Sequence, residues 1–522
     1  MKKKFYVTTP IYYPNDIPHI GHAYTTVAGD ILARWYKLKG YDVFFSVGTD
    51  EHGKKIADTA KKNGKSPKKF VDELVPKFKD AWKKLNIDYD NFIRTTDENH
   101  KKVVQDVLQK VYDKGDIYIG EYEGYYCTGC EAYFTGKDLV NGCCPVHKTK
   151  IEKLKEKSYF FKLSKYQKKL LELYKKNTDF ISPKNKKLEV INRIKEGLND
   201  LSISRTSFDW GIKLPFDDEH ICYVWFDALL NYYSATREKG KEKFWPADVH
   251  LIGKDILWFH AVYWPAMLMS AGIDLPKRIF AHGWWTFDKE KISKSRGKVI
   301  NVDELIKIAG VDSARYFLFR VTPFGDDGDF SEKALIERHN NELADKLGNL
   351  VSRVSGLIER NGLEKCGEKI PLSNEWKKLL IEGKVEIEVL RDPEAEDKTM
   401  HVLKIKGQRD IKRGEPFPLI ISEHLGLFFE ATRLLVEKHF ETYEFDKALN
   451  EIFKFIDHCN WYIQIRELWK SKDKRDLYEL KESILKIAEL LLPFIPESAE
   501  KIKKQFSATK IKKGKILFEK IR

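Results

Sequence analysis

Apolar and polar residues along the first hundred positions form blocks that predict strand, helix, strand and helix in turn. Residues 4–9 and 41–49 are predicted to be buried parallel strands, and 41–49 is rich in Val and Phe. Helices are expected from His19 to about Lys39 and over residues 66–85, with a short strand near 91–95. Strands that alternate with helices predict an α/β domain with a doubly wound, Rossmann-type parallel sheet.

The pattern changes at about Gly115. Tyr, Gly and Cys dominate up to residue 147, and lysine-rich helices are expected over 164–200, which indicates an insertion into the α/β domain. The α/β pattern returns near Tyr223 and ends with a shorter α/β segment over 300–330. From Leu335 onward the apolar spacing is helical. Two runs of alternating apolar and polar residues interrupt these helices and predict a β-hairpin near 384–421.

Composition narrows the class of protein. The chain has 522 residues and a net charge of +14, and nine of its last 22 residues are Lys or Arg against the single acidic Glu519. Such a balance suits either a solvated surface or a polyanionic partner such as a nucleic acid. No apolar run approaches the roughly 18–20 residues of a membrane span, and the residues after Lys2–Lys4 do not match a signal peptide. We therefore expect a soluble, cytoplasmic protein without a membrane partner.

Cysteine spacing predicts a metal site. Four of the seven cysteines lie within residues 127–144, where Cys127 and Cys130 are followed by Cys144 and His147. Two such pairs are typical of a tetrahedral Zn²⁺ knuckle, and a site filled by four protein ligands is structural rather than catalytic. Cys143 is an alternative ligand to Cys144. A loop of buried thiols without metal is the other interpretation.

Two short motifs suggest nucleotide chemistry. His19, Gly21 and His22 stand at the expected start of a helix, where free N–H groups and the helix dipole favour anions. The two imidazoles can donate to phosphate oxygens, and Gly21 lets a base or ribose approach the backbone. Much later, the segment KISKS at 291–295 carries Lys291 and Lys294, which could stabilise a pyrophosphate leaving group. Each motif alone is weak.

Together and in this order, the two motifs resemble the HIGH and KMSKS signatures of class I aminoacyl-tRNA synthetases, with Ile292 in place of the usual Met. Further segments resemble the methionyl-tRNA synthetases over about 480 residues. These segments are YVTTPIYY at 6–13, GTDEHG at 48–53, YVWFDA at 223–228, GKDI at 253–256 and HGWW at 282–285. The resemblance implies a methionine–tRNA ligase that activates L-methionine with ATP and Mg²⁺ and transfers it to the 3′-terminal adenosine of tRNA(Met), including the initiator.

The resemblance also assigns roles to residues. It implies catalysis by His19, His22, Lys291 and Lys294, and binding of ATP by these four together with Gly21. We call these five residues the ATP set. It implies a methionine set in which Asp50 holds the ammonium group, the Ile11 backbone assists, and the thioether is enclosed by Tyr13, Trp225, Ala228, Leu229, Tyr232 and His282. Polarizable aromatic walls suit a thioether, and a phenol or imidazole touching the sulfur could reject an aliphatic isostere.

The same resemblance places the anticodon-binding residues Asn349, Arg353 and Trp469 in the helical region. Asn349 and Arg353 are four residues apart and share a helix face, and an aromatic side chain can stack on an unpaired base. The hairpin has no counterpart in the family, and we expect a monomer. The predicted segments are 1–114 and 206–295 for the catalytic domain, 115–205 for the zinc-knuckle insertion, 296–340 for a tRNA stem-contact region, and 341–522 for an α-helical anticodon-binding domain.

Other enzymes fit less well. The isoleucine, valine and leucine synthetases carry a large editing domain in the insertion, which here has only roughly 90 residues. The cysteine enzyme uses a zinc-ligating Cys ahead of the HIGH-type motif, and this chain has no Cys before Cys127. Small nucleotidyltransferases with a HIGH-type motif lack the helical region. A non-catalytic tRNA-binding paralogue would not need the intact His19, His22, Asp50 and Lys294. A methionine-dependent pyrophosphate exchange assay separates these alternatives.

Overall fold

The fold was analysed in a computed structural model. The structure describes residues 2–127, 132–134, 139–145, 148–287, 290–291, 300–365, 372–382, 384–392, 395–405, 419–420 and 425–522. Two compact units are present. Unit 1 comprises Met1–Trp284 with Val299–Val302, and unit 2 comprises Trp285–Lys298 with Asp303–Arg522. The finer division into five segments stays a prediction.

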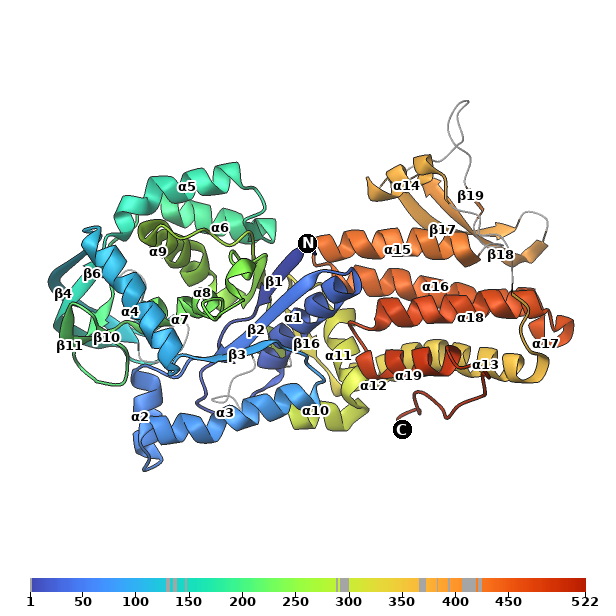
Figure 1. Cartoon of the computed structure of the whole chain (residues 1–522), viewed down its shortest axis with the longest axis horizontal. Helices are drawn as coiled ribbons and strands as arrows, with labels where there is room; N and C mark the ends of the chain where they lie inside the picture. The colour runs from blue at the N-terminus through green and yellow to red at the C-terminus, as the bar shows by residue number, and fades with distance from the viewer. Residues whose placement is uncertain are drawn as a thin grey trace. The chain divides into compact units, whose positions relative to one another are not determined.

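A six-stranded parallel sheet forms the centre of unit 1, as the alternation of strands and helices predicted (Figure 1). Its order is β3-β2-β1-β12-β13-β7. The strands are β1 (Lys4–Thr8), β2 (Asp42–Thr49), β3 (Asn91–Arg94), β7 (Ile181–Ser182), β12 (Val249–Gly253) and β13 (Ile279–His282). The order runs outward from β1 to β2 and β3 on one side and from β12 to β13 on the other, with β7 added beyond β13, so it reverses between β1 and β12. Ligands bind at such a switch point, beyond the carboxyl ends of the strands.

Local sequence explains the first helices. The backbone N–H groups at the start of α1 (Ile20–Leu38) are capped by His19, and those of α3 (Pro67–Lys84) by the Ser66 hydroxyl. Between them lies α2 (Lys54–Lys62), in which only Ile56 and Ala60 are buried. After β3, the helix α4 (Glu98–Asp113) buries three valines at helical spacing, Val103, Val107 and Val111.

The insertion is built mainly on an antiparallel sheet of order β5-β4-β6-β8. Its elements are β4 (Ile117–Cys127), β5 (Ala132–Phe134), β6 (Glu152–Phe161), η2 (Leu163–Tyr166), α5 (Gln167–Lys176), α6 (Lys184–Lys195) and β8 (Leu201–Ser202). One strand of the insertion, β7, belongs to the central sheet instead. It pairs with β13 through Ile181 and Ser182. The predicted segment 115–205 therefore supplies one edge strand of the catalytic sheet.

The rest of unit 1 covers the central sheet and leads back into it. A small antiparallel sheet contains β9 (Ser204–Arg205), β10 (Lys213–Leu214) and β11 (Asp217–Cys222). The helical elements that follow are α7 (Val224–Leu229), α8 (Asn231–Ser234), η3 (Glu242–Phe244), η4 (Lys254–Ile256), the π-helix η5 (Phe259–Tyr263) and α9 (Trp264–Ala271).

Unit 2 is mainly helical, as predicted from Leu335 onward. It begins with a sheet of order β15-β14-β16, formed by β14 (Trp285–Phe287), β15 (Glu290–Lys291) and β16 (Gly328–Phe330). Its helices are α10 (Val302–Ala309), α11 (Val311–Arg320), α12 (Glu332–Arg338), the π-helix η7 (His339–Gly348), α13 (Asn349–Asn361), α14 (Asn374–Ile381), α15 (Leu425–Glu441), α16 (Phe445–Ile465), α17 (Leu468–Ser471), α18 (Lys474–Leu491) and α19 (Pro496–Phe506). The helices α13, α15, α16, α18 and α19 lie alongside one another (Figure 1).

The predicted hairpin is confirmed and has a third strand. β17 (Val385–Asp392) pairs antiparallel with β18 (Ala395–Ile405), which pairs with β19 (Leu419–Ile420). The basic C-terminal tail packs against the helices of unit 2. Phe518 is buried, and the Asn340 side chain exchanges two hydrogen bonds with the backbone of Ile521. Its many lysines therefore line an anchored segment.

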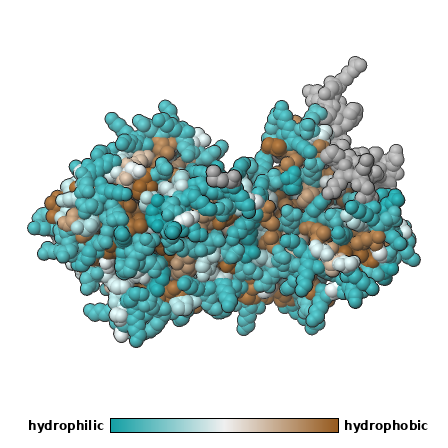
Figure 2. Space-filling view, viewed as in Figure 1, coloured by the Kyte–Doolittle hydropathy of each residue, from teal (hydrophilic) through white to brown (hydrophobic). Residues whose placement is uncertain are grey.

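No helix among the described residues is both long and apolar enough to cross a membrane. On the face shown in Figure 2, hydrophilic residues dominate the surface, in keeping with a chain that is 33% charged.

Candidate functional site

The start of α1 holds the two predicted histidines close together. The His19 and His22 rings stack with their centroids 3.8 Å apart. The Gly21 N–H donates to His19 Nδ1, and the His19 N–H donates to His22 Nδ1. Because Nδ1 accepts a hydrogen bond in both rings, each neutral ring carries its proton on Nε2. Burial and the neighbouring His19 and Lys55 hold the pKa of His22 well below its usual value, so this ring is neutral.

Gly21 leaves space for the His19 ring, which is a use of this glycine that the sequence did not suggest. A Cβ atom added at Gly21 would lie 3.0 Å from Cε1 of His19. Glycine therefore lets the His19 ring fold over the first turn of α1 and cap it.

The loop after β1 is tied directly to the end of β2. The Tyr12 N–H donates to the Gly48 carbonyl over 3.1 Å, and the Asp50 N–H donates to the Tyr12 carbonyl over 2.9 Å. A Cβ on Gly48 would lie 2.2 Å from the Ile93 carbonyl oxygen and 2.9 Å from Cγ2 of Ile11, so only glycine permits this approach. These bonds bring Ile11 and Tyr13, on either side of Tyr12, next to Asp50, which is buried.

Tyr12 also links this loop to α1. Its hydroxyl contacts the His22 carbonyl over 3.3 Å and the Thr26 hydroxyl over 3.0 Å. The first turn of α1 and the Asp50 loop are therefore joined through one buried tyrosine.

Four residues of the methionine set lie on α7 and α8. Ala228, Leu229 and Tyr232 are buried, and the half-buried Trp225 stacks on Phe259 with ring centroids 3.7 Å apart. The rings of Tyr232 and His250 also stack, at 4.2 Å. Trp225 and Tyr232 therefore each stack on another ring, that of Phe259 and that of His250 respectively.

The Tyr232 hydroxyl is already engaged. Nδ1 of His260 donates to the Ile256 carbonyl, which leaves Nε2 to accept the Tyr232 proton over 2.7 Å. Burial lowers the pKa of His260 to about 4, so this ring stays neutral and keeps its acceptor. Tyr232 therefore has no proton to offer a ligand sulfur in this arrangement.

His282, at the carboxyl end of β13, is also a ring whose two nitrogens are both hydrogen-bonded. Its Nδ1 donates to the Gly283 carbonyl over 2.7 Å, and its Nε2 accepts from the Thr25 hydroxyl over 2.6 Å. Burial lowers the pKa of His282, so the ring is neutral and both nitrogens are used. The sequence left open whether a phenol or imidazole would act on the sulfur. In this arrangement neither ring has an uncommitted proton.

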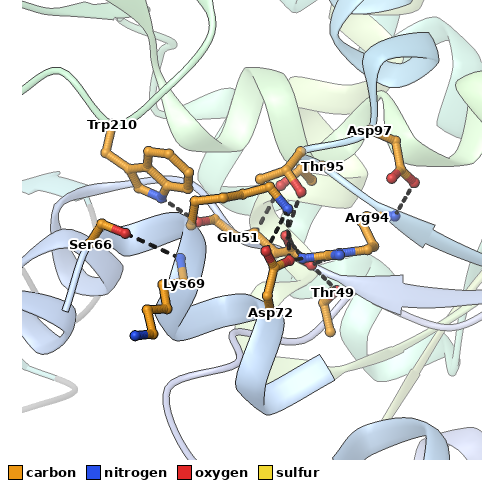
Figure 3. A network of polar contacts seen from close by, with 11 residues as sticks. Thr49, Glu51, Ser66, Lys69, Asp72, Arg94, Thr95, Asp97 and Trp210 are labelled. Carbon is orange, nitrogen blue, oxygen red and sulfur yellow. Dashed lines mark hydrogen bonds and ion pairs between the residues drawn. The ribbon is translucent and has the colours of Figure 1, made fainter. Parts of the chain in front are cut away.

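The residue after Asp50 belongs to a buried ionic network. Glu51 is completely buried, and its carboxylate accepts two hydrogen bonds from Arg94 over 2.6 and 2.9 Å. In Figure 3 the Arg94 guanidinium lies between Glu51 and Asp72. Burial alone would lower the pKa of Arg94, but the two carboxylates raise it above its usual value. A fully paired network of this kind fixes the backbone beside Asp50.

The metal prediction is only partly within the described residues. Cys127 and Cys144 are buried, and Cys143 is more exposed. Cys130 and His147 lie outside the described residues, as do Lys294 and the side chain of Lys291. Burial of soft thiols suits zinc coordination and distinguishes Cys144 from its neighbour.

The predicted anticodon residues lie on unit 2. Asn349 is the first residue of α13 and Arg353 is the fifth. Burial lowers the pKa of Arg353, and its guanidinium has no ion pair within the part of the chain that the structure describes. Trp469 is 43% exposed on the single turn α17, between Glu467 and Lys472, which both have left-handed backbone with φ of 44° and 54°.

Several buried polar residues at the site were not assigned roles from the sequence. They are His52, His100, Asp227, His250 and His260, together with the partly buried Arg94. The available signal was a charged or imidazole residue inside an otherwise apolar run, as with Asp227 in YVWFDA. Their partners lie far away in sequence, which the pattern alone does not reveal.

Comparison with known proteins agrees with this architecture. A family model described as tRNA synthetases class I (M) matches residues 5–154 and 135–355, and one described as the anticodon-binding domain of tRNA ligase matches residues 429–521. The matched ranges cover both the central sheet with its insertion and the helical C-terminal region.

Relatives and solved structures match over nearly the whole chain. A methionine–tRNA ligase of Caldanaerobacter subterraneus subsp. tengcongensis is 43% identical, covering 100% of this chain and 79% of that protein. The Rickettsia conorii ligase is 44% identical, covering 98% and 94%. The crystal structure of Mycobacterium tuberculosis methionyl-tRNA synthetase bound by methionyl-adenylate superposes with a TM-score of 0.82 at 36% identity, covering 96% and 94%. The chain therefore belongs to the methionine–tRNA ligase family of class I tRNA synthetases.

Proposed function

We propose that this chain is an ATP-dependent methionine–tRNA ligase. It activates L-methionine to methionyl-adenylate with release of pyrophosphate, and then transfers methionine to the 3′-terminal adenosine of tRNA(Met), including the initiator. We place it in the cytoplasm and expect a monomer. One observation carries the proposal. Direct hydrogen bonds join the loop at 11–13, the Asp50 loop, the start of α1 and α7 into one cluster at the sheet's carboxyl edge.

In the first step, the Asp50 carboxylate holds the methionine ammonium, and neutral aromatic rings enclose the thioether. The methionine carboxylate then attacks the α-phosphate of ATP in line. The Nε2–H groups of His19 and His22 donate to phosphate oxygens, and Lys291 and Lys294 stabilise charge on the departing pyrophosphate. Mg²⁺ bound with the ATP phosphates supplies further charge neutralisation.

The experiment that tests the function is methionine-dependent ATP–pyrophosphate exchange, followed by charging of tRNA(Met). We expect exchange with methionine and little with leucine, isoleucine or cysteine. Exchange that does not depend on methionine would contradict the proposal. Binding of tRNA(Met) without exchange would indicate a non-catalytic paralogue.

We propose that Cys127, Cys130, Cys144 and His147 bind one structural Zn²⁺ in the insertion, which we assign to residues 115–205. Two observations support this ligand set. The spacing provides two ligand pairs, and Cys127 and Cys144 are both buried. Bound zinc would cross-link the end of β4 to the segment that carries Cys144 and His147 and so stabilise the insertion.

Replacing Cys144 with Ser should lower the zinc content from about one ion per chain to near none, because structural sites need all four ligands. The matched variant Cys143→Ser removes the adjacent, more exposed thiol and should keep its zinc. Zinc is measured by mass spectrometry on purified protein, together with the thermal unfolding temperature. Loss of zinc from Cys143→Ser alone would reverse the ligand assignment.

We also propose that unit 2 reads the anticodon through Asn349, Arg353 and Trp469, that 341–522 forms the anticodon-binding domain, and that 296–340 contacts the tRNA stem. The partly buried Arg353 guanidinium lacks an ion pair among the described residues, so it can bind an external acceptor. The two left-handed residues that flank α17 hold the Trp469 indole at the surface, where it can stack on a base.

Replacing Trp469 with Ala should reduce kcat/KM for tRNA charging by roughly 5- to 150-fold, since stacking of one base on an aromatic ring contributes about 1–3 kcal/mol. Pyrophosphate exchange without tRNA should stay at the wild-type rate. The control is Ile516→Ala, which truncates another exposed apolar side chain of unit 2. Equal charging by both variants would remove Trp469 from the interface.

A further inference from the structure

A buried polar cluster of unit 1 that the mechanism does not use is centred on Asp227. This residue lies on α7 and is 1% exposed. One carboxylate oxygen accepts from Nδ1 of His52 and the other from Nε2 of His100, each over 2.7 Å. Nδ1 of His100 in turn contacts the Ser234 hydroxyl over 2.7 Å. The cluster therefore joins four segments: the Asp50 loop, α4, α7 and α8.

The protonation states follow from the geometry. A carboxylate only accepts hydrogen bonds, so both imidazoles donate to it. Burial alone would raise the pKa of Asp227, but His52 and His100 outweigh burial and hold this pKa below its usual value. Asp227 is therefore an ionised group whose two oxygens are each bound by one ring. Losing the carboxylate would leave two buried N–H groups without a shared acceptor.

The position of Asp227 gives the cluster its significance. Trp225 and Ala228 of the methionine set are its near neighbours on α7, and Tyr232 lies on α8, to which the same cluster is bonded. His52 lies two residues after Asp50. On its other side, the His52 ring packs edge-on against Trp210 at 5.5 Å, and Trp210 donates to the Glu51 carbonyl over 2.6 Å (Figure 3). The Asp50 loop is thus held between α7 and the segment around Trp210.

We infer that Asp227 is a positioning residue that sets the distance between the ammonium-binding Asp50 and the thioether-binding walls on α7 and α8, and so selects amino acids of methionine's length. The inference rests on the proposed function. Asp227 touches neither substrate. It acts through His52 on the Asp50 loop, and through α7 and α8 on the aromatic walls. A fixed spacing is a physical means of rejecting a side chain one methylene longer, which apolar contact alone discriminates only modestly.

The test compares Asp227→Asn with Asp116→Asn in the full-length enzyme. Asn keeps the size of the side chain but can accept from only one of the two imidazoles. Asp116 is an equally buried carboxylate that accepts from Lys165, Tyr166 and Ser270, away from the methionine set. Both variants lose a buried charge, and only Asp227→Asn loosens the Asp50 loop.

Steady-state pyrophosphate exchange with methionine and with ethionine is the measurement. For Asp227→Asn we expect KM for methionine to rise about tenfold or more, as for a lost buried hydrogen bond, with kcat and KM for ATP nearly unchanged. The preference for methionine over ethionine should fall about fivefold or more. Asp116→Asn should change neither quantity. If Asp227→Asn does not fold, His52→Ala carries the same expectation, because it removes the bond between Asp227 and the Asp50 loop together with the ring contact to Trp210.

The inference is overturned if Asp227→Asn behaves like Asp116→Asn, or if kcat falls while KM for methionine and the preference over ethionine stay constant. A wild-type protein that shows no methionine-dependent exchange would instead refute the proposed function.

Discussion

Replacing Asp50 with Asn is expected to raise KM for methionine by roughly 30-fold to several thousand-fold, because removing one partner of a buried, hydrogen-bonded charge pair costs about 2–5 kcal/mol. Asn preserves the size of the side chain and removes the charge that the methionine ammonium needs. Asp50 is 5% exposed, so water cannot replace the lost partner. KM for methionine and for ATP, measured by pyrophosphate exchange, separate this effect from a general loss of activity.

The matched control is Asp248→Asn. Asp248 directly precedes β12 and lies at the amino ends of the sheet's strands, away from their carboxyl ends. The Asp248 carboxylate accepts from the Tyr6 N–H over 2.7 Å and pairs with Lys277, so its loss affects the start of β1 rather than the site. We expect its methionine KM to match the wild type, with a lower thermal unfolding temperature. A methionine KM for Asp50→Asn within twofold of that control would show that another group binds the ammonium.

Replacing Lys294 with Ala is expected to slow adenylate formation by about 10²- to 10³-fold, the usual cost of removing one preorganised group that stabilises transition-state charge. Methionine binding should be unchanged, since the lysine acts on the departing pyrophosphate. Single-turnover formation of methionyl-adenylate measures the step directly, and methionine affinity is measured separately.

Lys307→Ala is the control for this variant. Lys307 is an exposed lysine on α10, the helix that follows the KISKS segment in the sequence. It should form adenylate at the wild-type rate. A near-normal rate for Lys294→Ala would remove this lysine from the mechanism and leave Lys291 as the only predicted cation of the motif.

The sequence predicted the central sheet well because its strands are buried on both faces. Runs such as 41–49 are rich in Val and Phe, and β2 begins and ends within one residue of the expected bounds. α3 was predicted as closely, since Ser66 caps its start. α2 was not predicted, because a helix with only two buried residues has too little apolar pattern. β7 was not predicted either, since two residues carry no period at all.

The same distinction between local patterns and contacts made on folding applies to the site residues. Residues in contiguous motifs, such as His19 and Asp50, could be assigned roles from the sequence because the motif itself resembles a family. The roles of His52 and Asp227 depend on a contact between positions 175 residues apart, which only folding brings together. The proton assignments of Tyr232 and His282 also required coordinates. The first depends on the bond from His260 Nδ1 to the Ile256 carbonyl, and the second on the bond from His282 Nδ1 to the Gly283 carbonyl.

The pairing of β7 with β13 has a consequence for shortening the chain. A chain lacking residues 115–205 would lose β7 and leave β13 as an unpaired border of the catalytic sheet. β13 is fully buried and apolar except for its final histidine, and a bare, apolar strand of this kind recruits strands from other molecules. Removing the insertion should therefore produce aggregation even where the remaining helices and strands can still fold.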